Sequence, residues 1–165
     1  MLNRNKRPEI QVMLIRRYCK TTLFLLFNFF LVANTLASDF VAVKSSKAIL
    51  YEGPSESTKK ELIITEGYPL VVMVSLKDWL KVKDHEGKIS WIKSSDITTE
   101  RTVMTLKPDS YIYSNASSDS IKLGNVEESV ALKLLSVLAT DGWVNVKSES
   151  QGIDGFISAN DIWGI

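Results

Sequence analysis

Residues 77–97 read KDWLKVKDHEGKISWIKSSDI, and residues 140–162 repeat the pattern as TDGWVNVKSESQGIDGFISANDI. In each copy a Trp (Trp79, Trp143) opens a run of alternating residues. A Gly-containing turn follows, and a second run closes on Asp-Ile. Alternation with a period of two is typical of a half-buried β-strand. Because the pattern occurs twice, the chain is predicted to fold as two small β domains in tandem.

Shorter matches extend the repeat outward from these segments. The triplet ending at Tyr51 (ILY) matches the triplet ending at Tyr113 (YIY), and residues 70–76 (LVVMVSL) match residues 130–138. The first of these two apolar runs is predicted to be a strand buried on both faces. We therefore predict an all-β fold of two small barrels, one in residues 38–98 and one in residues 99–165. The polar link at 98–102 is short, so we expect the halves to pack together.

Residues 1–37 have the pattern of an export signal. Arg16, Arg17 and Lys20 precede the apolar run at 23–33, and small residues lead to a possible cleavage after Ala37. An uncleaved membrane anchor is the alternative, although a spanning helix needs about 20 apolar residues. Met13 would be a more typical start than Met1. We therefore expect the protein to be exported to the periplasm or cell envelope, with no membrane span after cleavage.

Charge and cysteine content exclude several classes of function. Six of the 20 basic side chains and one of the 19 acidic ones lie in residues 1–37, so residues 38–165 carry a formal charge of −4. This charge argues against nucleic acid as a partner. The single cysteine, Cys19, lies in the signal segment, so the rest of the chain can form neither a disulfide nor a Cys-His nucleophile.

Catalytic and metal-binding patterns are not found. His85 is the only histidine, and its neighbours Asp84 and Glu86 are expected to form a solvated hairpin loop rather than a metal site. We therefore predict no cofactor, no metal and no enzymatic activity. Asp96 and Asp161, at matching positions, are interpreted as turn caps that accept backbone N–H bonds.

The return strands each pair an aromatic residue with Ile, as Trp91-Ile92 and Phe156-Ile157. Large apolar rings are more often buried than exposed. We therefore interpret Trp91 and Phe156 as core residues.

These segments resemble a known family. KDWLKVK followed by SWIKSSDI is similar to the Trp strand and closing turn of Src-homology-3 (SH3) domains, and AILYEGPS to the opening of the bacterial version. The resemblance implies an exported, non-catalytic domain that binds cell-wall or peptide ligands. In eukaryotic members a Pro and a Tyr complete the groove for proline-rich ligands. The Pro position here holds Lys93 and Ser158, and the Tyr position holds Asp96 and Asp161, so that groove is largely missing.

The sequence thus favours a non-enzymatic binding module for a cell-envelope ligand, either peptidoglycan or an envelope protein. The alternative is a structural or assembly factor that docks a single protein partner. Candidate ligand-binding residues are Trp79, Trp143, Tyr51 and Tyr113. Each Trp is predicted to lie on the polar face of its strand, where an exposed ring is often an anchor for a partner. A ring that instead closes a secondary core over a loop is the other interpretation.

Overall fold

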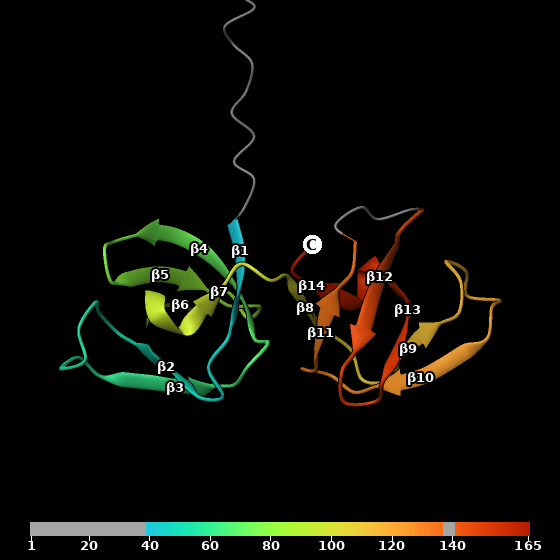
Figure 1. Ribbon diagram of the computed structural model, residues 1–165, viewed down its shortest axis with the longest axis horizontal. Coiled ribbons are helices and arrows are strands. Elements are labelled where there is room, and N and C mark those ends of the chain that lie inside the picture. Colours follow the sequence, from blue (N-terminus) through green and yellow to red (C-terminus); the bar gives the residue numbers. More distant parts are fainter. Residues whose placement is uncertain (1–38, 137–140) are drawn as a thin grey trace, which may run out of the picture. The chain divides into compact units, whose positions relative to one another are not determined.

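The structure is a computed structural model that describes residues 39–136 and 141–165, so the predicted signal at 1–37 lies outside the described residues. The described residues form strands and two single turns of 3₁₀ helix, with no α-helix among them (Figure 1). None of their helices is long and apolar enough to cross a bilayer. The prediction of an all-β fold is confirmed.

Two seven-stranded sheets are formed by consecutive stretches of the chain (Figure 1). The first contains β1 (Asp39–Val43), β2 (Ala48–Tyr51), β3 (Lys60–Ile64), β4 (Pro69–Ser75), β5 (Trp79–Lys83), β6 (Ile89–Lys93) and β7 (Ile97–Thr98). The second contains β8 (Thr102–Thr105), β9 (Ser110–Tyr113), β10 (Lys122–Val126), β11 (Ala131–Leu134), β12 (Trp143–Ser148), β13 (Ile153–Ser158) and β14 (Ile162–Trp163).

Both sheets have the same strand order. The first runs β3-β2-β6-β5-β4-β1-β7 and the second β10-β9-β13-β12-β11-β8-β14, with every pairing antiparallel. The predicted pair of small β domains is therefore present. One sheet ends at Thr98 and the next begins at Thr102, while the domain bounds 38–98 and 99–165 stay a prediction.

Each sheet encloses its own apolar core. In the predicted Trp strands, Val82 in the first half and Val144 and Val146 in the second are at most 1% exposed. The return strands add Ile92 and Ile157, both fully buried. Since neighbouring residues of a strand point to opposite faces, the Trp that opens each strand lies on the outer face, as predicted.

Trp91 and Phe156 do not belong to these cores, so their interpretation as core residues is wrong. Each lies between two buried residues of its strand, and each is itself only half-buried and absent from the core cluster. Ile92 and Ile157 occupy the inner face, which places the preceding aromatic ring outside. The aromatic-Ile pattern fixes which residue is buried only once the register is known.

The prediction that residues 70–76 are buried on both faces is also wrong. Leu70 is fully buried, but the other end of the segment carries Met73, Val74 and Leu76, each nearly half exposed. The β4–β5 register shifts between Val72 and Val74, as at a β-bulge. A bulge bends its strand and re-aims side chains, so the distal part of β4 projects apolar groups away from the core.

The two aspartates at matching positions are structural, but they bond side chains rather than backbone groups. Ser45 Oγ donates to Asp96 Oδ1 at 2.8 Å, and Lys107 Nζ donates to Asp161 Oδ1 at 2.5 Å. A backbone hydrogen bond joins the same two segments, because Lys44 N donates to the Asp96 carbonyl. The expected partners, backbone N–H groups, are therefore replaced by side-chain donors. Each aspartate holds its 3₁₀ turn against the loop after the first strand of its half.

The halves meet through a cluster centred on Arg101. Its Nη2 donates to the Gly164 carbonyl at 2.8 Å, and its guanidinium lies 4.9 Å from the Phe40 ring centroid. Phe40 in turn stands edge-on to Trp163, with centroids 5.2 Å apart. The cluster thus joins β1 of the first sheet to the end of the second, and residues 38–165 form one compact unit.

His85 belongs to this junction and not to a solvated loop, which corrects the sequence-based expectation. Its Nδ1 is 3.0 Å from Tyr68 Oη, and its ring lies 6.4 Å from that of Trp163. Asp84 is 3% exposed, and its Oδ1 accepts the backbone N–H groups of Glu86 and Lys88. The aspartate therefore shapes the hairpin that delivers His85 to its aromatic neighbours.

Arg101→Ala tests the junction. Loss of the charged hydrogen bond and of the cation–π contact should lower the free energy of unfolding by about 1–3 kcal/mol in urea. Lys47→Ala is the control, because Lys47 is exposed and has no bonded partner among the described residues. Equal stability of the two variants would show that Arg101 does not hold the halves together.

Tyr68 gives the fold a pH dependence in the alkaline range. Burial, aided by the negative charges of Asp84 and Glu86, raises the pKa of Tyr68 to about 12 from an ordinary 10.0. The folded state then holds the phenolic proton more tightly than the unfolded state. This contribution to stability is complete below pH 10 and is lost as pH rises towards 12.

Tyr68→Phe should therefore remove part of the alkaline decline. The stability difference between wild type and variant, measured by urea unfolding at pH 8, 10 and 11.5, should narrow as pH rises. Because the other tyrosines and the lysines titrate in both proteins, their effects cancel in that difference. A difference that is constant across this range would contradict the role given to Tyr68.

Candidate functional site

The structure brings the four sequence-predicted site residues together as two equivalent pairs. Tyr51 and Trp79 meet edge to face with centroids 5.2 Å apart at 87°, and Tyr113 and Trp143 do so at 5.3 Å and 81°. Tyr51 is 4% exposed, whereas Trp79 is half-buried. The tyrosine ring therefore supports the tryptophan ring, which keeps part of its surface open to solvent.

Strand pairing explains why each pair forms. Tyr51 ends β2 and pairs with Trp91 of β6, and Trp79 opens β5 and pairs with Lys93 of the same β6 strand. The return strand thus carries both rings on one outer face. In the second half Phe156 of β13 pairs with Tyr113 of β9, which sets up the same geometry.

The loops that follow the tyrosines share one set of hydrogen bonds although their sequences differ. Thr58 Oγ1 donates to the carbonyls of Gly53 and Ser55 at 3.1 and 2.7 Å. Ser120 Oγ donates in the same way to Asn115 and Ser117, at 3.1 and 2.8 Å. The Gly-Pro-Ser segment is therefore dispensable for this loop, because one hydroxyl that bonds two carbonyls closes it.

The surroundings of the two pairs differ in charge. Opposite Trp79 lies Lys93, whose ammonium is 2.5 Å from the carboxylate of Glu56 in the loop after β2. The hydrogen bond between them raises the pKa of Lys93 and lowers the pKa of Glu56, so both stay charged at neutral pH. Opposite Trp143 lies the neutral Ser158. The first pair is thus flanked by an ion pair, and the second is not.

Apolar side chains adjoin the first pair. The Trp79 carbonyl accepts the backbone N–H of Leu76 at 2.8 Å, and Leu76 and Val74 are 48% and 46% exposed. Exposed apolar residues at the tip of the β4–β5 hairpin therefore lie on the strand next to the tryptophan. An exposed apolar patch next to an aromatic anchor is typical of a binding surface.

The sequence predicts part of the aromatic site, the two tryptophans, but it does not predict which residues surround them. The Trp-x-x-x-Lys alternation identified Trp79 and Trp143 as outward-facing residues. Glu56 and Lys93 are 37 positions apart in the sequence, and Leu76 was assigned to a buried strand, so no local pattern connects them with the tryptophan. Only the sheet register shows that they share a surface.

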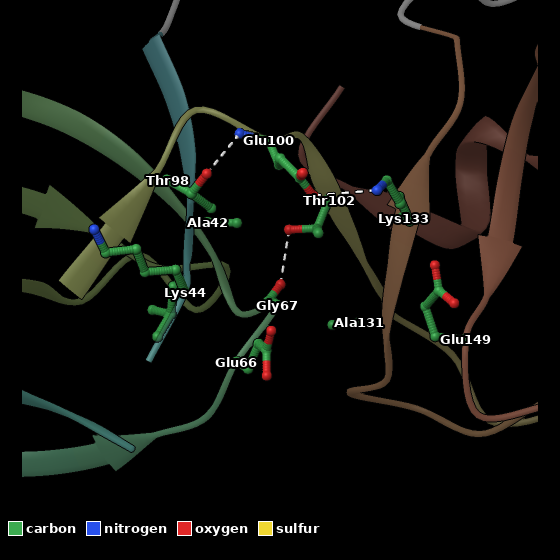
Figure 2. Close-up of a pocket in the computed structure, with 11 residues that line it drawn as sticks. Ala42, Lys44, Glu66, Gly67, Thr98, Glu100, Thr102, Ala131, Lys133 and Glu149 are labelled. Carbon is green, nitrogen blue, oxygen red and sulfur yellow. Dashed lines mark hydrogen bonds and ion pairs between the residues drawn. The ribbon is translucent and has the colours of Figure 1, made fainter. Parts of the chain in front are cut away.

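A concave region lies between the halves. A cavity of about 490 Å³ has walls from the end of β1, the turn at 66–67, the link at 98–102 and strand β11 (Figure 2). Thr102 Oγ1 donates to the Gly67 carbonyl at 2.7 Å across it, and Lys133 pairs with Glu100 at 3.2 Å. None of the four sequence-predicted site residues lines this cavity.

Catalytic and metal-binding constellations are not found among the described residues. No group of three or more His, Cys, Asp or Glu side chains could hold a metal ion in that part of the chain. His85, the only histidine, bonds Tyr68 instead of a nucleophilic hydroxyl.

Comparison with known proteins places the first half in a family. Residues 44–98 match the bacterial SH3 domain. The bacterial SH3 domain is a binding domain, often associated with the cell wall and typical of extracellular or envelope proteins. The resemblance drawn from the sequence is therefore confirmed for this stretch.

Solved structures give weaker likenesses. NlpC2 from Trichomonas vaginalis has a TM-score of 0.35 and 14% identity, over 78% of this chain and 49% of that chain. An NlpC/P60 family protein from Bacillus cereus ATCC 10987 has a TM-score of 0.34 and 19% identity, over 75% and 55%. This chain spans about half the length of the solved structures it matches. Comparison with curated proteins gives no match.

Gly155→Ala should disturb the Tyr113–Trp143 pair, because the new methyl group would push against the strand that carries Tyr113. A Cβ at Gly155 would meet the Tyr113 carbonyl oxygen and approach Ile112 Cγ2 to 2.8 Å, so β9 must shift. Such overpacking costs about 1–3 kcal/mol, and it should alter the near-ultraviolet circular dichroism from Tyr113 and Trp143. Unchanged stability and an unchanged near-ultraviolet spectrum would contradict this account.

Ser90→Gly is the matched comparison, because Ser90 takes the position of Gly155 in the first half. There the structure accommodates a side chain: Ser90 is 2% exposed, and its Oγ donates to Glu61 Oε2 at 2.8 Å. This variant should lose that hydrogen bond to a carboxylate, about 1.5–3 kcal/mol, and a further 0.5–1 kcal/mol or so because glycine is unfavourable inside a strand. Its spectrum from Trp79 and Tyr51 should be retained.

Proposed function

We propose that the chain is a non-enzymatic binding module of the cell envelope that recognises peptidoglycan or an envelope protein through Trp79 and Tyr51. The observation that carries this proposal is the half-buried Trp79 ring, supported by the buried Tyr51 and next to exposed Leu76 on the paired strand. The match of residues 44–98 to a binding-domain family supports it. Export to the periplasm or envelope is part of the same proposal.

The Trp79 ring is held in place before a ligand binds. Tyr51 fixes the tryptophan edge to face, so little side-chain freedom is lost when a ligand covers the exposed part of the ring. The Lys93–Glu56 pair beside it offers both a donor and an acceptor at the rim. A ligand with an apolar contact surface and flanking polar groups suits such an arrangement.

The second pair is assigned a lesser role in recognition. Trp143 lacks a charged neighbour at the Lys93 position, where Ser158 stands. The residue after β11, Leu135, is 45% exposed, but residues 137–140 lie outside the described part. We propose that Trp143 and Tyr113 contribute contact area without the polar rim.

A protein partner is a second candidate, and one observation favours it. The β4–β5 hairpin carries three exposed apolar residues, Met73, Val74 and Leu76, and a polar wall polymer would leave such apolar area uncovered. In that case the chain is an assembly factor that docks one envelope protein. Pull-down of the same protein with purified sacculi and with solubilised envelope proteins separates binding to the wall from docking on an envelope protein.

Trp79→Ala tests the site. Binding to sacculi or to the captured envelope protein should fall at least about tenfold, as for an aromatic hot spot. The free energy of unfolding should fall by only about 1–2 kcal/mol, because the ring is half open and its edge-to-face contact is worth about 0.5–1.5 kcal/mol.

Trp143→Ala is the matched control, since it removes an equivalent ring from an equivalent pair. Its binding should remain within about threefold of wild type, a change of less than 1 kcal/mol. The proposal fails if Trp79→Ala binds like wild type. It also fails if Trp79→Ala loses stability by the roughly 3–5 kcal/mol of a buried aromatic, because the ring would then be structural.

A further inference from the structure

The tip of the β4–β5 hairpin protrudes from the first sheet. β1 runs alongside β4 only as far as Asp39, which lies opposite Val72, so the later residues of β4 have no described strand on that side. All six residues at 73–78 are exposed. Three of them are large, apolar and nearly half exposed: Met73, Val74 and Leu76. The hairpin can therefore bring apolar side chains to another surface without any change in the core.

Strand pairing places basic groups beside these apolar groups. Val74 lies directly opposite Lys81, so their side chains are on one face of the hairpin. Leu76 and Trp79 close the hairpin on that face, with the N–H of Leu76 donating to the Trp79 carbonyl at 2.8 Å. Lys77 stands in the turn between them. The result is an apolar tip with ammonium groups around it.

The ammonium groups of the hairpin are not neutralised by partners. The ion pairs among residues 39–136 and 141–165 engage other lysines, namely Lys88, Lys93, Lys107, Lys133 and Lys147. Lys77, Lys81 and Lys83 belong to none of them. The hairpin at 73–83 has one carboxylate, that of Asp78, against these three lysines. It therefore carries an excess of positive charge.

The two halves differ in charge, which gives the molecule a direction. Residues 38–98 have nine basic and nine acidic side chains, whereas residues 99–165 have five basic and nine acidic ones. The formal charge of −4 therefore belongs to the second half. Asn145, which is uncharged, takes the position of Lys81 there. An anionic surface would repel the second half and leave the hairpin of the first half as the side that approaches it.

The lysines favour a lipid bilayer over a protein as the occupant of this tip. Lysine is depleted at protein–protein interfaces, and an ammonium group is costly to remove from water. At a bilayer surface the ammonium group stays among the headgroups, while its methylene groups and the neighbouring apolar side chains enter the boundary with the acyl chains. Apolar groups and unpaired lysines on one face are thus compatible only if the ammonium groups remain hydrated.

We propose that the tip of the β4–β5 hairpin docks on the surface of an anionic lipid bilayer. Met73, Val74 and Leu76 enter the boundary between headgroups and acyl chains, and the lysines at 77, 81 and 83 contact anionic headgroups. The contact holds the chain at the membrane surface without spanning it. It rests on the proposed function only for the location in the cell envelope.

The test uses residues 38–165, which form one compact unit, because the apolar run at 23–33 would itself bind lipid. Binding is measured by co-sedimentation with vesicles of phosphatidylcholine and phosphatidylglycerol in equal parts, and with vesicles of phosphatidylcholine alone. Binding to the mixed vesicles should be at least about tenfold stronger, because each lysine near an anionic surface contributes roughly fivefold. Salt at about 1 M should remove most of this difference.

Two hairpin variants separate the apolar part of the contact from the electrostatic part. Leu76→Ser and Lys81→Gln should each weaken binding to the mixed vesicles about fivefold, and only Leu76→Ser should weaken the residual binding to phosphatidylcholine. Ile121→Ser and Lys47→Gln are the matched controls, because both residues are exposed and lie outside the hairpin. The controls should bind within about twofold of wild type. Thermal melts should show that all four variants fold.

Several results would overturn the proposal. It fails if residues 38–165 do not sediment with the mixed vesicles, if both kinds of vesicle bind equally, or if the controls weaken binding as much as the hairpin variants. An envelope protein that loses its binding to Leu76→Ser, and that vesicles do not displace, would also reject the bilayer as the occupant. Purified sacculi contain no lipid, so retained sacculus binding without vesicle binding would reject this contact alone and leave the proposed function standing.

Discussion

The guanidinium of Arg101 is the constraint on which the arrangement of the two halves depends. It lies on the link between the sheets, donates to the carbonyl of Gly164 after β14 and covers the ring of Phe40 in β1. Its Nε is buried without a hydrogen-bond partner among the described groups. An unpaired buried donor costs free energy, so the remaining contacts of the guanidinium must offset that cost.

The cavity between the halves follows from this clamp. A domain of about 60 residues buries too little surface to be very stable alone, and docking a second one adds apolar contact area. Phe40, Trp163, Tyr68 and His85 supply that area in a chain of ring contacts. The space lined by Ala131 and Gly67 is therefore kept by these ring contacts together with the hydrogen bond from Thr102 to Gly67 across it.

Strand positions could be predicted from the sequence because alternation is a local property. The strands Trp79–Lys83 and Ile89–Lys93 lie in the segment 77–97, where the alternation indicated two strands, and a single 3₁₀ turn at Ser94–Asp96 follows them. Burial could not be predicted as well. Met73 and Leu76 lie in an apolar run, yet a bulge turns them outward, and a bulge has no local sequence pattern here.

The candidate site could be predicted only in part, for a related reason. The outward direction of Trp79 follows from the buried Val82 on the same strand, but the identity of its supporting ring depends on which strands pair. Tyr51 meets Trp79 because both β2 and β5 flank β6, and that order is not local information. The expectation that His85 lies in a solvated loop is wrong for the same reason, because its partners, Tyr68 and Trp163, come from distant segments of the chain.

The strand order has a consequence for solubility. β3 and β10 stand at the ends of their sheets, each hydrogen-bonded along one side only, and carry exposed Ile63 and Leu123. An open strand with apolar side chains can recruit a strand from another molecule. Lys60 and Lys122 open these two strands. Like charges brought face to face repel, so these lysines oppose intermolecular sheet growth, and high salt weakens that protection.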